Sequence, residues 1–291
     1  MAQVFGSFQE TTRTRAARAE DRVRVQLVTD PWSVWCWGFE PVRRTLELRY
    51  PSIEFQALLG GMFPQMPDPK QMGFDVERFF NQVNRTTGMP VGLESVRNNS
   101  PGSTFPACVS VHAARLADPE GEARFLRVLR EAVYIDGLDA SKPSVGRQAA
   151  RRVGIDLEAY DDELASGRAQ EAFELRMEEL THANLFAYPT LLVTSRGKTT
   201  RIEGFQSLPA VVGVVEAVSD RLHPPLPDPP LEAIVPEGER VATREVGEAL
   251  GISLERAFER LRKAQRKGDL VRRRLPQGDV WMRPGTPAGF S

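Results

Sequence analysis

The chain has 291 residues, of which 41% are hydrophobic and 26% charged, and its formal net charge is −1. This length and composition are typical of a soluble globular protein of about two domains. No apolar run approaches the ~20 residues that a membrane helix needs, and the polar first residues predict no secretory signal. Two Cys and three His are too few for a disulfide framework or a structural metal site. We therefore expect a cytoplasmic protein with no metal and no membrane contact.

The first ordered unit is predicted to be strand, helix, strand. Residues 1–21 are polar and predict a flexible N-terminal tail. Residues 22–29 alternate apolar and polar side chains and predict a half-buried strand, and residues 52–60 predict a second one. Between them, residues 38–50 predict a helix with Pro41 in its first turn, where proline is tolerated. Two strands joined by a helix are expected to lie parallel.

A long helical segment follows this unit. Helices are predicted over residues 74–87, 106–117, 121–134 and 156–182, and over the stretch that is capped by Asp139–Ser141 and ends at Gly154. Residues 187–204 then predict a β-hairpin with its turn near Gly197, and residues 207–222 predict a closing amphipathic helix. This order of elements is that of a thioredoxin fold with a helical domain inserted at about residues 65–185.

The C-terminal part of the chain is predicted to be a separate small domain. Residues 223–238 hold six Pro and predict an extended, stiff linker. Residues 239–291 predict two helices around a turn at Gly251, followed by a β-hairpin, which is the order of a winged helix. The predicted fold class is therefore α/β: a thioredoxin fold with an inserted helical domain over residues 22–222, a linker, and a small winged-helix-like domain.

The second predicted helix of this small domain carries a basic face. Arg256, Arg260, Lys263 and Lys267 recur every three or four residues and so share one side of the helix. Such a face is a candidate for phosphate contacts and DNA binding. However, acidic residues interleave, and residues 241–283 hold only 11 Lys and Arg against 6 Asp and Glu. We therefore expect docking within the chain or on a partner protein rather than on DNA.

The stretch DPWSVWCWGFE, residues 30–40, is the strongest candidate for a site. It follows the first predicted strand and holds Trp32, Trp35 and Trp37, three of the four Trp in the chain, together with Cys36, one of its two Cys. Three Trp that straddle a turn cannot all point inward, so at least one is expected to be exposed. The other candidates for chemistry, Cys108, His112 and His182, are expected to be structural, since a lone Cys is most often a small buried hydrophobe.

Three motifs together resemble a known family. DPWSVWCWGFEP is similar to a D-P-x-C-x-W-C-[WY]-G motif that follows a first strand, FPACVSVHAARL is similar to a P-A-C-x-A-V-x-A-A helix start, and AYPTLLV is similar to a cis-proline loop. In this order they resemble the DsbA/FrnE-like branch of the thioredoxin superfamily, over roughly residues 22–222. The resemblance implies a cis bond between Tyr188 and Pro189.

The resemblance also assigns roles within the motif. Ser33 stands at the position of the nucleophilic Cys, and Cys36 stands at the resolving position, so a dithiol cycle between the two is impossible. The residues that this resemblance implies for substrate binding are Trp32, Trp35, Trp37, Tyr188 and Pro189.

Four interpretations of Ser33 and Cys36 remain open. In the first, the site binds peptide or thiol substrates, or a partner protein, as an adaptor or chaperone-like module without a cofactor, because exposed aromatic side chains beside a cis-proline loop suit peptide binding. In the second, Ser33 donates a hydrogen bond to glutathione, as in the similar kappa-class glutathione transferases and chromene-carboxylate isomerases. In the third, Cys36 acts alone through mixed disulfides. In the fourth, Ser33 is an engineered replacement of the Cys of a disulfide oxidoreductase. We prefer the first.

Overall fold

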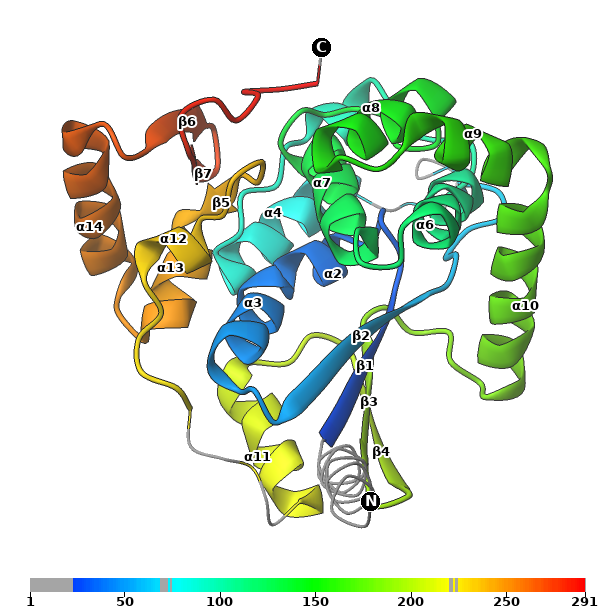
Figure 1. Cartoon of the computed structure of the whole chain (residues 1–291), viewed down its shortest axis with the longest axis horizontal. Coiled ribbons are helices and arrows are strands. Elements are labelled where there is room, and N and C mark those ends of the chain that lie inside the picture. The colour runs from blue at the N-terminus through cyan, green and yellow to red at the C-terminus, as the bar shows by residue number, and fades with distance from the viewer. Residues whose placement is uncertain (1–22, 69–72, 74, 220–221, 223–224, 291) are drawn as a thin grey trace, which may run out of the picture.

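The structure is a computed structural model that describes residues 23–68, 73, 75–219, 222 and 225–290 (Figure 1). The predicted tail over residues 1–21 lies outside them. No helix formed by these described residues is both long and apolar enough to cross a membrane.

A four-stranded sheet forms the centre of the larger unit. Its strands are β1 (Val23–Thr29), β2 (Ile53–Leu59), β3 (Thr190–Ser195) and β4 (Lys198–Glu203), in the order β2-β1-β3-β4. β1 and β2 are parallel, which confirms the prediction for the first unit, and the other pairs are antiparallel. Two helices, α2 (Val34–Gly38) and α3 (Glu40–Arg49), connect β1 to β2.

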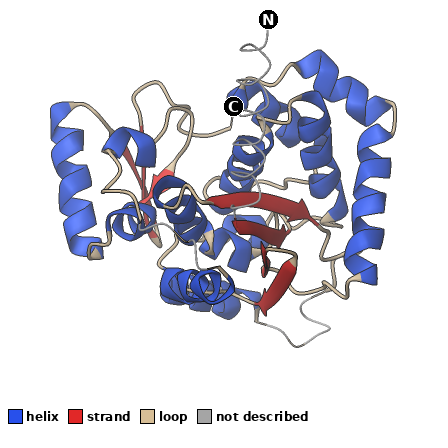
Figure 2. Ribbon diagram, turned by 60° about the horizontal axis from the view of Figure 1, so that its bottom comes forward, coloured by secondary structure: helices blue, strands red, loops and turns tan. Residues whose placement is uncertain are grey.

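Helices cover both faces of this sheet (Figure 2). On one face, α3 and α11 (Leu208–Val218) pack against alternate strand residues, such as Val25 and Val193, in an apolar cluster. On the other face, α10 (Arg168–His182) contributes Leu180 to a cluster with Val28. Strand side chains alternate between the two faces, so both sides of the sheet can be buried in this way.

The helical insertion lies between β2 and β3. Its helices are α4 (Val76–Thr87), α5 (Glu94–Arg97), α6 (Phe105–Ala117), α7 (Glu122–Tyr134), α8 (Pro143–Val153), α9 (Leu157–Ala165) and α10. Gly154 ends α8 with a φ of 83°, in the left-handed region that favours glycine. The predicted cap of α8 is wrong, because the N-cap is Lys142. Asp139 instead accepts a hydrogen bond from the Ser141 amide at 2.9 Å and so stabilises the preceding turn.

The last part of the chain forms a second, smaller unit, here called the C-terminal unit (residues 225–290). Its elements are α12 (Leu231–Ile234), β5 (Val241–Ala242), α13 (Thr243–Leu250), α14 (Leu254–Lys267), β6 (Val271–Leu275) and β7 (Gly278–Met282). The strands pair in the order β5-β7-β6. Trp281 is fully buried between the sheet and the two main helices, with Leu250 and Leu261 in the same core. This is a helix-turn-helix followed by a hairpin, as in a winged helix.

The Pro-rich segment over residues 223–238 is not an extended linker throughout. Its residues 231–234 form α12, and Ile234 and Val235 are fully buried in the core of the C-terminal unit. The amide of Leu226 donates to the carbonyl oxygen of Arg49 at 2.7 Å. The prolines favour extended backbone, but burial of the apolar residues between them in this core stabilises a packed segment instead.

A network of buried charges joins the two units. Its members are Glu40, Arg44, Arg127, Arg130, Glu131, Glu239, Arg240 and Glu245, and all of them are buried. Arg44 on α3 pairs with Glu239 at 2.5 Å and with Glu245 at 3.0 Å. Arg127 on α7 pairs with Glu245 at 2.8 Å. The C-terminal unit is therefore docked on α3 and α7 and is not a tethered domain.

Candidate functional site

Ser33 lies where the chain turns from β1 into α2. Its backbone is extended, and its Oγ accepts a hydrogen bond from the Cys36 amide at 3.3 Å, so Ser33 caps the helix. The same hydroxyl donates to the carbonyl oxygen of Tyr188 at 3.4 Å. The Tyr188–Pro189 peptide bond is cis. The fold thus brings together Ser33 and the Tyr188 loop, which are 155 positions apart.

An apolar groove opens beside Ser33. It has a volume of about 380 Å³, and we call it the Ser33 groove. Its walls are formed by Trp32, Ser33, Val34, Trp35, Met62, Phe63, Met66, Pro67, Val76, Phe79, Phe80, Val96, Ser100 and Tyr188. Trp35 is half-buried and meets Phe79 edge-on, with 6.2 Å between the ring centroids. None of the lining residues is charged, so this groove suits an apolar group.

The three Trp of the motif have different environments. Trp32 lines the groove, and its carbonyl oxygen accepts a hydrogen bond from the Tyr134 hydroxyl at 2.6 Å. Trp37 is fully buried, and its ring stacks on that of Tyr134 with 5.5 Å between the ring centroids. Its Nε1 donates to the carbonyl oxygen of Pro90 at 2.7 Å, and the Arg127 guanidinium lies 4.7 Å from the ring centroid. The prediction that Trp37 contacts a substrate is therefore wrong, because its ring belongs to the core.

Cys36 and Pro189 lie behind the groove rather than in it. Cys36 is fully buried, and burial raises the pKa of its thiol. A buried thiol that resists ionisation is a poor nucleophile, and Cys36 is not among the residues that line the groove. Pro189 is also buried and does not line the groove. Of the predicted substrate-binding residues, Trp32, Trp35 and Tyr188 form its walls.

Cys108, His112 and His182, which were predicted to be structural, do not line the Ser33 groove. Cys108 is fully buried, and its Sγ donates to the carbonyl oxygen of Gly60 at 3.5 Å. Burial lowers the pKa of His112 to about 4, which keeps its ring neutral. His182 is exposed at the end of α10.

Asp30, the first residue of the DPWSVWCWGFE stretch, belongs to the site but was not predicted as a site residue. Its carboxylate is fully buried and accepts hydrogen bonds from the amides of Trp32 at 2.6 Å and Met62 at 2.8 Å. Burial raises the pKa of Asp30 to about 6, although these hydrogen bonds oppose the shift. Asp30 therefore ties together two backbone segments that line the groove, and it titrates near neutral pH. Its signal was its position at the carboxyl end of β1.

The groove residues on α4 were also missed. Val76, Phe79 and Phe80 come from a helix that was predicted correctly, but only the fold shows that its apolar side meets Trp35. The pattern FDVERFF holds that signal in the sequence.

The basic residues predicted on the last long helix lie far from Ser33 in the fold. Arg256, Arg260, Lys263 and Lys267 are exposed on α14, at the far left of Figure 1. They line a separate, wider groove and take no part in the Ser33 groove.

A family model described as Thioredoxin matches residues 27–212, more than half of the chain. The chain belongs to the thioredoxin family. The ClpXP adapter protein SpxH of Halalkalibacterium halodurans is 22% identical over 262 residues, which cover 87% of this chain and 86% of that protein. A putative protein disulfide isomerase from Nitrosomonas europaea has a similar structure, with a TM-score of 0.60, 21% identity, and coverage of 67% of this chain and 97% of that one.

A further solved structure supports the same fold. The cytosolic disulfide reductase DsbM from Pseudomonas aeruginosa has a TM-score of 0.52 and 19% identity, and covers 67% of this chain and 94% of its own. The predicted family and the α/β thioredoxin fold are thus confirmed. The alignment with SpxH is longer than the span 27–212, so it includes residues outside the thioredoxin match.

Proposed function

We propose that this protein is an adaptor that binds a segment of a partner protein in the Ser33 groove, with little or no dithiol redox turnover. The observation that carries this proposal is the chemistry of the groove, which has uncharged, mostly apolar walls beside the helix-capping Ser33. Burying apolar surface contributes about 25 cal/mol per Å². A peptide with one or two large apolar side chains is therefore the best match.

The thiol chemistry of this position supports binding over redox turnover. A hydroxyl at Ser33 cannot form a disulfide, and Cys36 is buried behind it with a raised pKa. Both a dithiol cycle and a monothiol mechanism need a reactive thiolate at the groove, and neither Ser33 nor the buried Cys36 provides one there. What remains there is a set of binding surfaces.

Similarity to the SpxH proteins points to the kind of partner. These relatives are named ClpXP adapter proteins, and one of them aligns with 87% of this chain. We propose that the partner protein is one that the chain delivers to ClpXP. We also propose a cytoplasmic location, where thiols stay reduced, in accord with the free Cys36 and Cys108.

Replacing Trp35 by alanine is expected to weaken partner binding by about tenfold or more, because truncating a large aromatic side chain in a binding pocket costs on the order of 2 kcal/mol. Quantitative proteomics would measure protein half-lives in the wild-type strain, in a strain that lacks this chain and in a strain that lacks ClpXP. The proteins delivered by this chain are those whose half-lives lengthen in both deletion strains. Complementation with the wild-type chain should restore their degradation, whereas Trp35→Ala should not.

Leu175→Ala is the matched control for this experiment. Leu175 is an apolar side chain with 62% of its surface exposed, and it lies on α10 outside the groove lining. This variant should complement like the wild type. Full complementation by Trp35→Ala would contradict the groove as the binding site, and the absence of any protein stabilised in both strains would contradict the adaptor proposal.

The second candidate is glutathione binding at the same groove. It is favoured by one observation: the Ser33 hydroxyl borders the groove, and the hydrogen bond that it donates, to the Tyr188 carbonyl oxygen, is long at 3.4 Å. An external thiolate could replace that acceptor. Isothermal calorimetry with reduced glutathione distinguishes the candidates. We expect no saturable heat, since the groove has no charged residue for the glutathione carboxylates; saturable binding that Ser33→Ala removes would establish the second candidate instead.

A further inference from the structure

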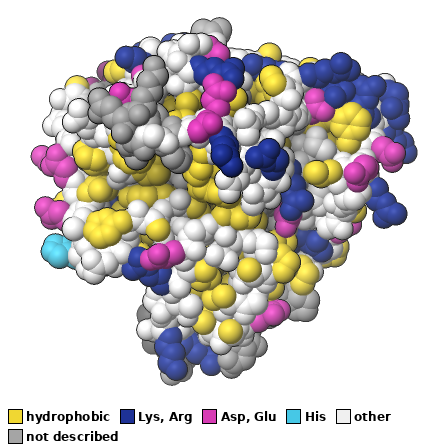
Figure 3. All heavy atoms as spheres, turned by 180° about the vertical axis from the view of Figure 1, so that it is seen from behind, with side chains coloured by type: hydrophobic (Ala, Val, Ile, Leu, Met, Phe, Trp, Pro, Cys, Tyr) yellow, Lys and Arg dark blue, Asp and Glu magenta, His cyan; other side chains and the backbone are white. Residues whose placement is uncertain are grey.

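A second groove lies on the C-terminal unit, along α14. It is open, has a volume of about 1100 Å³, and runs between α14 and the segment that holds Pro230 and Leu231. We call it the α14 groove. Its six basic side chains are Arg256, Arg260, Arg262, Lys263, Arg266 and Lys267, against three acidic ones, Glu232, Glu259 and Asp269. Figure 3 shows Lys and Arg gathered at this end of the molecule.

The basic side chains of this groove are not paired. Among the described residues, none lies within ion-pair distance of Arg256, Arg260, Lys263, Arg266 or Lys267. Arginines just outside the groove are paired. Two such pairs in the C-terminal unit are Arg244 with Glu248 and Arg272 with Asp279. The acidic Glu232 lies 3.8 Å from Arg283. The three carboxylates that line the α14 groove therefore offset only part of its positive charge within the described part of the chain.

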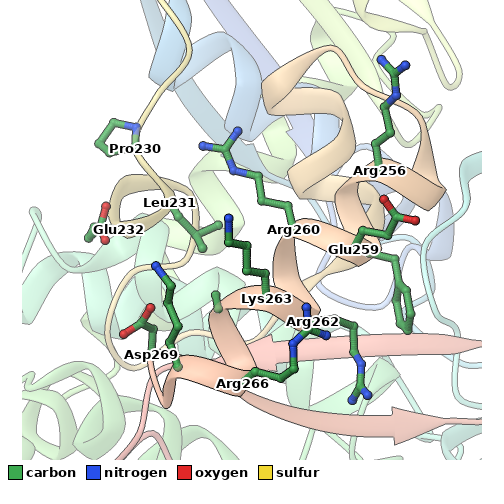
Figure 4. A pocket seen from close by; sticks show the side chains of 13 residues that line it. Pro230, Leu231, Glu232, Arg256, Glu259, Arg260, Arg262, Lys263, Arg266 and Asp269 are labelled. Carbon is green, nitrogen blue, oxygen red and sulfur yellow. The ribbon is translucent and has the colours of Figure 1, made fainter.

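The groove has apolar as well as basic walls. Leu231 and Phe258 line it together with Pro230. Arg260 and Lys263 extend from α14 toward the segment with Pro230 and Leu231, as Figure 4 shows. A ligand in the groove would thus meet ammonium or guanidinium groups and apolar surface at the same time, which matches a polypeptide with carboxylates and an aliphatic side chain.

The hairpin argues against nucleic acid as the ligand. When a helix-turn-helix unit binds DNA, its second helix enters the major groove and basic side chains around it contact phosphates. Here Arg272 pairs with Asp279 at 2.6 Å and lies over the rings of Phe258 and Trp281 at 4.8 and 5.5 Å. Arg273 is held by Asp136 of the larger unit at 2.5 Å. Of the three arginines on β6, Arg272 and Arg273 are therefore already engaged within the protein, and Arg274 is exposed.

We propose that the α14 groove is a second protein-binding surface, which takes an acidic segment of a partner protein with an apolar residue among its carboxylates. This second surface is formed by α14 and the residues around it, and it could bind a partner whether or not the Ser33 groove does. Docking of the C-terminal unit on α3 and α7 fixes the direction that the α14 groove faces relative to the Ser33 groove.

Fluorescence anisotropy with the full chain tests this proposal. The probe is a short fluorescein-labelled peptide of repeated Glu-Glu-Leu units, compared with a Gln-Gln-Leu peptide and a short DNA duplex. We expect the Glu-Glu-Leu peptide to bind most tightly, with an affinity that falls as salt is raised. The double variant Arg260→Glu with Lys263→Glu should weaken this binding by about tenfold or more, since like charges then face each other.

Lys198→Glu is the matched control. Lys198 is exposed on β4, outside the α14 groove, and its reversal should leave the affinity unchanged. Thermal melting of each variant confirms folding, which is expected because the reversed side chains are exposed. Tighter binding of the DNA duplex, equal binding of the Gln-Gln-Leu peptide, or an unchanged affinity in the double variant would each overturn the proposal.

Discussion

Replacing Glu245 by alanine is expected to lower the free energy of unfolding by about 3–5 kcal/mol, the range for breaking a buried ion pair from one side. Glu245 is fully buried on α13 and accepts hydrogen bonds from Arg44 at 3.0 Å and from Arg127 at 2.8 Å. Its other oxygen accepts from the Ala242 amide at 2.7 Å. Removing this carboxylate leaves two buried guanidinium groups and one buried amide with fewer partners.

Urea denaturation, followed by tryptophan fluorescence, measures this effect. Glu248→Ala is the matched control, because Glu248 lies on the same helix and pairs with Arg244, which is 39% exposed. A pair of that kind contributes about 0–1 kcal/mol. If Glu245→Ala were no more destabilising than Glu248→Ala, the buried network would not be what holds the C-terminal unit against α3 and α7.

The same network shows why docking of the two units could not be predicted from the sequence. Arg44 and Glu245 are 201 positions apart, and nothing in their local sequence marks them as partners. A charged residue on a predicted helix is usually exposed, so the residue type does not mark either one as buried. The Pro-rich composition then favoured a linker, although Ile234 and Val235 within it are core residues.

The order of elements could be predicted because it depends on local patterns. The alternation in residues 22–29 needs only the period of a strand, and Gly154 and Gly251 each end a helix at a left-handed position. The predicted start of α8 was wrong because proline fits the first turn of a helix without any side-chain cap, so the cap residues before it were not used.

The candidate site was predicted in part. Ser33 and Tyr188 came from motif resemblance, and the structure brings them within 3.4 Å. Which Trp faces the groove could not be predicted, since the direction of each ring depends on helices from the insertion: Trp35 meets Phe79 of α4, whereas Trp37 stacks on Tyr134 of α7. Side-chain direction within a single turn of helix is thus set by long-range packing rather than by the motif itself.

Replacing Asp30 by asparagine is expected to change how stability depends on pH. Burial raises the pKa of Asp30 to about 6 in the folded protein, from an ordinary value of 3.8. The folded state therefore binds this proton more tightly than the unfolded state. Its contribution to stability is fully present below about pH 4 and is lost as pH rises through about 6, by about 3 kcal/mol in total.

Asparagine cannot titrate, so the Asp30→Asn variant lacks this loss. The unfolding free energy of the variant minus that of the wild type should rise by about 2 kcal/mol between pH 4 and pH 6, as part of a total rise of about 3 kcal/mol that is complete above about pH 7. Urea denaturation at a series of pH values measures this difference, in which the other carboxyls cancel.

Glu77→Gln is the control for the sign of this effect. The side-chain hydrogen bond from Arg97 lowers the pKa of Glu77 on the protein surface, so the stability that Glu77 contributes increases as pH rises. The unfolding free energy of Glu77→Gln minus that of the wild type should therefore fall slightly over this range. A difference for Asp30→Asn that stays flat, or falls, between pH 4 and pH 6 would show that Asp30 is ionised throughout. In that case its bonds to the amides of Trp32 and Met62 would hold the edge of the Ser33 groove with a full negative charge, and the groove would be insensitive to pH in this range.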